Sequence, residues 1–304
     1  MKTSSYGNLM AAISFLIWGL TPIYYRFLPS AATDELLALR IIASVPVGVV
    51  LVWIMTKHWP NFHQVMTDKR SLLFTLIASL LMCISWSTFT WALTHDRVID
   101  ASLGFFISPL MMVALGVIIL KESLSLGKKL AIAFATLGLT YQVVDYGEVP
   151  YIALTMGVFF TFYGFCKKKV AFDWSTTLFL EALLLMPFAL VYMMYKHSLG
   201  DAVALSSDIE TLLFYLGSGP VTIAPLIFYS IAIRCTDMSN IGLMQYIEPT
   251  LQFILAVVIF GELFDQTKMI SFGLIWFGLM CIIAETLTTR SKRGLVSLGS
   301  VSKP

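Results

Sequence analysis

The chain is a succession of long apolar stretches joined by short polar connections, which few folds can accommodate. A helix needs about 20 mostly apolar residues to cross the hydrocarbon core of a bilayer. Such windows predict membrane-spanning helices at 8–28, 34–55, 71–92, 99–120, 127–145, 150–167, 175–196, 210–232, 239–260 and 267–288. We therefore expect an all-α integral membrane protein with about ten transmembrane helices.

The composition excludes an ordinary soluble domain. Hydrophobic residues make up 58% of the 304 residues and charged residues only 12%, whereas about 25% of a soluble chain is charged. A soluble fold would expose much of this apolar surface to water, but lipid solvates it. The lipid bilayer is thus the expected surrounding partner.

Lysine and arginine are distributed unevenly between the two sides of the predicted membrane. With the N-terminus in the cytoplasm, 15 of the 20 lie in cytoplasmic segments. The other side holds Arg26, Arg97, Lys196 and Lys268, and Arg40 falls within a span. Because basic residues concentrate in cytoplasmic loops, both termini are predicted to be cytoplasmic. One span more or fewer would destroy this bias.

The two halves of the chain share a repeat. One offset of 140 positions aligns four features spread over some 45 residues of the first half. The aligned pairs are Ala92-Leu93 with Ala232-Ile233, Ser108-Pro109 with Glu248-Pro249, Lys121-Glu122 with Gly261-Glu262, and Gly138 with Gly278. This alignment indicates an internal duplication.

Three segments follow from the repeat. We predict a first five-helix repeat over 1–146, a second over 147–290, and a disordered cytoplasmic tail over 291–304. Five is an odd number, so the second repeat enters the membrane from the opposite side and is inverted. Inverted repeats are typical of alternating-access carriers.

Glu248 is the strongest candidate for a substrate-binding group. It lies near the middle of a predicted span, where a charge is costly and usually faces a cavity or a partner. Gln245 and Gln252 share its helix face, and Tyr246 lies beside it. The alternative is a neutral or paired carboxyl that holds helices together.

Arg40 and Glu181 occupy matching places in the two repeats, since each precedes a proline, Pro46 or Pro187, by six residues. Arg40 lies toward the periplasmic side and Glu181 toward the cytoplasmic side. Both are candidates for a gate or vestibule. The alternative for each is a side chain that extends to the membrane interface.

Further candidates lie in the other spans. Ser85 and Trp86 combine hydroxyl and aromatic character, which suits an amphipathic substrate or, equally, helix packing. Trp18 and Ser108 complete the substrate-binding set; Ser108 matches Glu248 at the 140-residue offset. Pro109 and Pro249 are predicted to bend their helices at matching depth.

Several classes of protein lack support in the sequence. There is no basic tract with interleaved aromatics, so nucleic-acid binding is not expected. The four cysteines are isolated, no CxxC or HExxH occurs, and no metal or cofactor is predicted. The run Lys167-Lys168-Lys169 is interpreted as a topology anchor.

Several segments in both halves carry a family resemblance. They are Trp18–Pro22, Glu35–Arg40, Ala101–Pro109, Gly219–Thr222, Gln245–Thr250 and Gly261–Glu262. Together they resemble the RarD group of EamA-type carriers in the drug/metabolite transporter superfamily. The resemblance implies two inverted EamA repeats in the inner membrane. Leu39, Ser85 and Ser108 depart from the His and Asn residues expected there.

The expected function is secondary transport of small metabolites or drugs by alternating access. Relatives in the resembling family include amino-acid exporters, and RarD proteins carry a chloramphenicol-sensitivity label. Amino acids, aromatic compounds and chloramphenicol-like molecules are therefore the candidate substrates. A membrane-embedded enzyme and a structural or signalling membrane protein are the alternatives. The oligomeric state stays open, with a homodimer among the options.

Overall fold

The computed structural model describes residues 2–25, 27, 33–57, 62–95, 97–259 and 266–299. The regular secondary structure of the described part consists of α-helices. Its helices are α1 (Lys2–Tyr25), α2 (Thr33–Thr56), α3 (Phe62–Thr67), α4 (Lys69–Thr94), α5 (Val98–Ile118), α6 (Leu126–Tyr146), α7 (Tyr151–Lys169), α8 (Trp174–Ser198), α9 (Val203–Ser206), α10 (Ile209–Cys235), α11 (Met238–Gln245), α12 (Ile247–Val258) and α13 (Gln266–Gly299).

A helix, or the α11–α12 pair, coincides with each predicted span. Within the described residues, seven helical spans are long and apolar enough to cross a membrane, and Ser102–Ile118 in α5 is a shorter apolar helix. The α6 and α7 helices fall outside both groups. The all-α membrane fold is confirmed, whereas the count of ten crossings stays a prediction.

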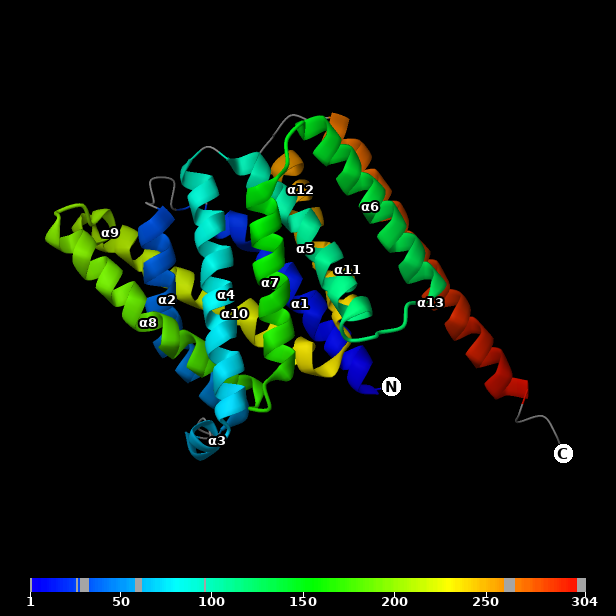
Figure 1. Cartoon of the computed structure of the whole chain (residues 1–304), viewed down its shortest axis with the longest axis horizontal. Helices are drawn as coiled ribbons and strands as arrows, with labels where there is room; N and C mark the ends of the chain where they lie inside the picture. Colours follow the sequence, from blue (N-terminus) through cyan, green and yellow to red (C-terminus); the bar gives the residue numbers. More distant parts are fainter. Residues whose placement is uncertain are drawn as a thin grey trace.

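The helices α6 and α13 show that the halves are inverted. They run side by side at one edge of the molecule (Figure 1). A Cβ added to Gly138 would lie 2.9 Å from the Ser271 carbonyl oxygen, and one added to Gly278 would lie 2.9 Å from the Cα of Ala131. Ala131 and Ser271 are themselves 140 positions apart. The same contact thus occurs twice, with partners exchanged and helices antiparallel, as an inverted repeat requires.

The halves also exchange packing partners. The first helix of each half packs along the third helix of the other, so that α1 lies against α10 and α7 lies against α4. Ser14 donates a hydrogen bond to the Pro225 carbonyl at 2.8 Å, and Ser85 donates one to the Met156 carbonyl at 3.2 Å. The two repeats therefore form a single interlocked bundle.

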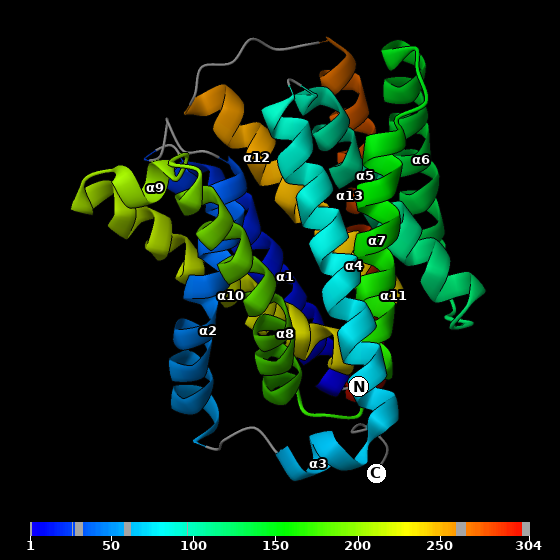
Figure 2. The same ribbon diagram turned by 60° about the vertical axis from the view of Figure 1, so that its left-hand side comes forward.

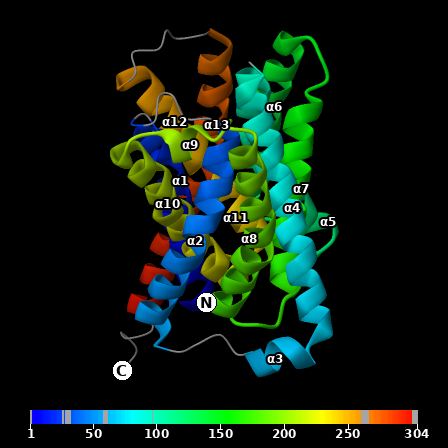
Figure 3. The ribbon, with the colours of Figure 1, turned by 90° about the vertical axis from the view of Figure 1, so that its left-hand side faces the viewer.

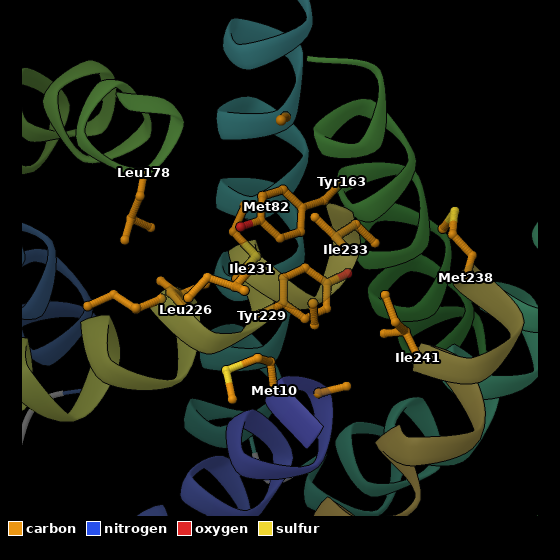
Figure 4. Packing of buried hydrophobic residues seen from close by; sticks show 14 of the residues in the cluster. Met10, Met82, Tyr163, Leu178, Leu226, Tyr229, Ile231, Ile233, Met238 and Ile241 are labelled. Atoms are coloured by element: carbon orange, nitrogen blue, oxygen red, sulfur yellow. The ribbon is translucent and has the colours of Figure 1, made fainter. Parts of the chain in front are cut away.

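Aromatic and thioether side chains fill the centre of this bundle. Tyr163 and Tyr229 stack with ring centroids 5.9 Å apart and planes 11° apart. Met10, Met82 and Ile241 belong to the same cluster (Figure 4). Flexible thioethers fit the irregular gaps between such rings.

Apolar side chains also cover the outside of the bundle. On α8, Phe188, Val191 and Met194 are between 67% and 71% exposed. An exposed apolar surface of this kind marks a membrane contact. The outward face of α8 is therefore suited to lipid.

Two aspartates begin helices at the predicted cytoplasmic end. Asp68 accepts from the Ser71 N–H at 3.0 Å, and Asp173 accepts from the Thr176 N–H at 2.6 Å. Partial burial raises the pKa of Asp173, but hydrogen bonds from Ser175 and Thr176 outweigh that effect and hold the pKa below its ordinary value. Both residues are helix N-caps.

The two ends of the described chain lie on the same side of the molecule. The start of α1 and the far end of α13 both point toward the end that carries α3 (Figures 2 and 3). The α13 helix continues to Gly299, so part of the predicted tail 291–304 is helical, and residues from 300 onward lie outside the described residues.

Candidate functional site

A cavity lies in the middle of the bundle, between helices of both halves. The first half contributes α2 and α4, and the second contributes α7, α8 and α10. The cavity volume is about 40 Å³, within about 430 Å³ of empty space when the part open to solvent is counted. Its polar lining groups come from Ser44, Ser79, Tyr163, Glu181 and Thr222, and the other lining side chains are apolar or aromatic. Such a lining suits a small amphipathic organic molecule.

One lining residue, Glu181, belongs to a buried ion pair. The Lys167 ammonium donates to Glu181 Oε1 at 2.7 Å and to Oε2 at 2.6 Å, and the Tyr163 hydroxyl donates to Oε2 at 3.2 Å. Lys167 is 1% exposed and Glu181 6% exposed. The carboxylate is therefore neutralised within the protein before any ligand binds.

Sequence reasoning missed this role of Lys167. The lysine run predicted a topology anchor, but only Lys169 of the three is exposed. Lys168 donates to the carbonyls of Ile233 and Thr236 at 3.3 and 2.6 Å, at the end of α10. The sequence feature that could have indicated this role is the short connection between α7 and α8. It places Glu181 of α8 next to Lys167 at the end of α7.

Arg40 lies beside the same cavity. Its guanidinium carbon is 4.3 Å from the ring centroid of Trp86, which lines the cavity, as do Ile41 and Ser44 of its own helix. Its Nε and Nη2 atoms are buried and have no hydrogen-bond partner among the described residues. Arg40 and Glu181 thus hold repeat-related positions, but within the described part of the chain only Glu181 has an oppositely charged partner.

Glu248 and its neighbours form a second group, away from the lining of the cavity. Gln245 donates to the Ser108 hydroxyl at 3.0 Å, and the Tyr246 hydroxyl donates to the Phe106 carbonyl at 3.4 Å. Phe106 and Tyr246 are 140 positions apart, so this contact joins repeat-related residues. The prediction paired Ser108 with Glu248 across the repeats, whereas the structure brings Gln245 to Ser108.

The remaining candidates have internal partners. Gln252 donates to the buried Glu248 carboxylate at 3.4 Å. Ser85 is bonded to α7, as described above. Trp18 packs against the rings of Phe15, Phe160 and Tyr229. Among the predicted residues, Trp86 and Glu181 line the cavity and Arg40 adjoins it.

The two prolines sit differently in their helices. Pro109 lies inside the continuous α5. Pro249 lies near the start of α12, and the helix is interrupted three residues earlier, at Tyr246 between α11 and α12. Proline cannot donate to the carbonyl four residues before it, and for Pro249 that carbonyl belongs to Gln245, the last residue of α11.

Comparison with known proteins identifies the family of this two-repeat bundle. The model of the EamA-like transporter family matches the chain twice, over residues 5–143 and 150–284. The chain belongs to the EamA-like transporter family. It is therefore a multi-pass membrane protein of the drug/metabolite transporter superfamily.

Individual relatives agree with this EamA membership. An uncharacterized transporter of Vibrio cholerae is 33% identical over 281 residues, which span 92% of this chain and 93% of the relative. Protein RarD of Escherichia coli is 31% identical over 96% of this chain and 98% of its own length. A chloramphenicol-sensitive protein RarD of Pseudomonas aeruginosa is 24% identical over 97% of this chain.

A solved crystal structure shares the fold. It superimposes with a TM-score of 0.66 at 19% identity and covers 91% of this EamA chain and 97% of its own. Within the described residues, no group of three or more His, Cys, Asp and Glu side chains is placed to hold a metal ion.

Proposed function

We propose that this EamA-family protein is a secondary carrier that moves small amphipathic organic molecules through the central cavity. The observation that carries the proposal is the position of the cavity, which takes its walls from both inverted halves. In alternating access, two such halves rock about a central site and open it to one side at a time. The protein would act in the inner membrane with both termini in the cytoplasm.

A polar cluster at the predicted periplasmic end supports this mechanism. Lys196 of α8 lies 2.9 Å from Asp34 of α2. Glu35 accepts from the N–H groups of Val203 and Ala204 at 3.0 and 2.7 Å. These contacts join α2 to α8 and α9 at one end of the cavity-lining helices. In the proposed cycle they separate when the carrier opens to that side.

The test uses purified protein in proteoliposomes. Phenylalanine, 3-phenylpropionate and chloramphenicol are screened first by thermal shift and then by counterflow of the labelled compound. We expect at least one of them to accumulate in vesicles that contain the protein. If the folded protein moves none of them, the proposal is wrong.

A cavity-filling variant sharpens the assay. Ala182 lines the cavity, so Ala182→Trp is expected to reduce counterflow to background. Ala133 is exposed on α6, and Ala133→Trp serves as the matched control with unchanged transport. Equal transport by the two variants would show that this cavity is not the route.

A further inference from the structure

We propose that Arg40 and Trp86 form the binding subsite for the carboxylate group of a substrate that also has an apolar body. This inference rests on the proposed carrier function and adds the chemical class of the substrate. Its starting point is a cation placed at the cavity with unused hydrogen-bond donors.

The geometry leaves the guanidinium edge free. The Arg40 guanidinium carbon lies 4.3 Å from the centroid of the Trp86 ring, and a ring stabilises the charge electrostatically. This contact provides no nitrogen or oxygen acceptor for the Nε and Nη2 donors, which stay without a hydrogen-bond partner among the described residues. Nε and Nη2 are adjacent donors that match the two oxygens of a carboxylate.

The acidic residues on the same helix are engaged elsewhere. Asp34 binds Lys196 and Tyr192, and Glu35 binds backbone N–H groups at the start of α9. A buried charged donor without a partner is costly, and a polar group kept in that condition within a membrane protein is a functional signal. The missing partner is therefore expected to arrive with the substrate.

A second unpaired polar atom lies in the cavity wall. Thr222 Oγ1 is buried without a hydrogen-bond partner among the described residues. The α10 segment around it packs on α2, where Ser44 donates to the Gly219 carbonyl at 3.4 Å. Thr222 thus lines the cavity from α10, while the Arg40 guanidinium lies against the lining residue Trp86 and comes from the adjoining helix α2.

The rest of the lining defines the other end of the substrate. Met82, Leu178, Leu185 and Leu226 are apolar and line the same space. Lys167 is already neutralised by Glu181 and does not line the cavity, so it adds no free positive charge beside Arg40 for a dianionic phosphate. A monocarboxylate with an aromatic or aliphatic body fits these groups.

The test compares acids with their uncharged amides. The probes are 3-phenylpropionate, 4-methylpentanoate and the corresponding amides, and the dissociation constants are measured by titration of the purified protein at fixed ionic strength. We expect each acid to bind about 10- to 100-fold more tightly than its amide, because hydrogen bonds to a charged partner are strong. Equal affinities, or binding by none of the four probes, would overturn the inference.

Variants of Arg40 test whether this residue causes the preference for the acid over the amide. Arg40→Gln should bring the acid-to-amide ratio to about one while amide binding persists. Arg40→Lys, which keeps the charge but loses the planar fork, should retain part of it. The matched control is Arg70→Gln, because Arg70 also lies over a ring, that of Phe74 at 5.9 Å, but is exposed. An unchanged ratio in Arg40→Gln would refute the assignment.

Two further measurements complete the test. If Arg40→Gln does not fold, Thr222→Val provides the second readout and should weaken acid binding several-fold without changing amide binding. Counterflow of the amides separates the two proposals. Transport of acids and amides without preference would leave the carrier function intact and refute the carboxylate subsite. Arg40-dependent binding of the acids without any transport would support the subsite and refute the carrier function.

Discussion

Removing the ammonium of Lys167 should be among the most destabilising single changes in the bundle. The Lys167 Nζ atom lies 2.6 Å from Glu181 Oε2. At an effective dielectric constant of about 20 their attraction is about 6 kcal/mol, and dehydrating both ions offsets most of it. Lys167→Met removes the attraction but leaves the dehydrated carboxylate in place. We expect a loss of about 3–5 kcal/mol in unfolding free energy.

A double-mutant cycle provides the assay. Unfolding of the purified protein by SDS in mixed micelles is followed for Lys167→Met, Glu181→Leu and the double variant. The double variant should recover most of the loss, because the uncompensated charge is gone and the cavity wall becomes apolar. Lys169→Met is the control, since Lys169 is exposed at the end of the same helix and should change stability by less than about 1 kcal/mol. If the single losses simply add, the ion-pair reasoning is refuted.

Three more predictions concern contacts outside the cavity. Gly278→Ala should cost about 1–3 kcal/mol because its Cβ would lie 2.9 Å from an α6 Cα atom, whereas Gly273→Ala, with open space around it, should be nearly neutral in the same unfolding assay. Equal effects would contradict the close α6–α13 packing. Glu122 accepts the first two N–H groups of α11 at 2.8 Å each, so Glu122→Gln should cost about 1–2 kcal/mol and increase amide exchange there; unchanged exchange would exclude the cap. Because the pKa of Asp173 is lowered in the folded state, the stability it adds is complete above about pH 4 and is lost as the pH falls through the folded pKa. Asp173→Asn should flatten that acid limb of the stability curve, and an identical limb would assign the acid sensitivity to other groups.

Much of the fold could be predicted because the membrane imposes simple constraints on the chain. Span length and apolar content locate the helices, and the 140-residue offset indicates that the halves are related. The offset even pairs Gly138 with Gly278, whose contacts carry the symmetry in the structure. The interruption at Tyr246 was not predicted, because proline frees a carbonyl four residues earlier rather than at its own position.

The candidate site was harder to predict than the fold, because a sequence shows which polar residues lie in the membrane but not which of them contact one another. Glu248 satisfied every criterion of depth and helix face, yet it bonds Gln252 outside the cavity lining. Lys167 was overlooked because a basic run at a helix end is a normal topology signal, and only the return of the chain through α8 turns its side chain into a partner of Glu181. Substrate contact for the predicted residues remains a prediction.

Arg40 in α2 and Glu181 in α8 occupy repeat-related positions but have different roles in the two halves. Arg40 and Glu181 precede Pro46 and Pro187 by the same six residues, and both prolines lie inside their helices, α2 and α8. Each proline removes a backbone hydrogen bond next to the cavity wall, so both helices can bend at equivalent depth. In α8 the charge of Glu181 is neutralised by Lys167, which ties that wall to α7, whereas the charge of Arg40 in α2 has no partner among the described residues. In the proposed cycle, a ligand that binds Arg40 would therefore act on α2 and not on its repeat-related counterpart α8, so the two halves would respond to the substrate unequally.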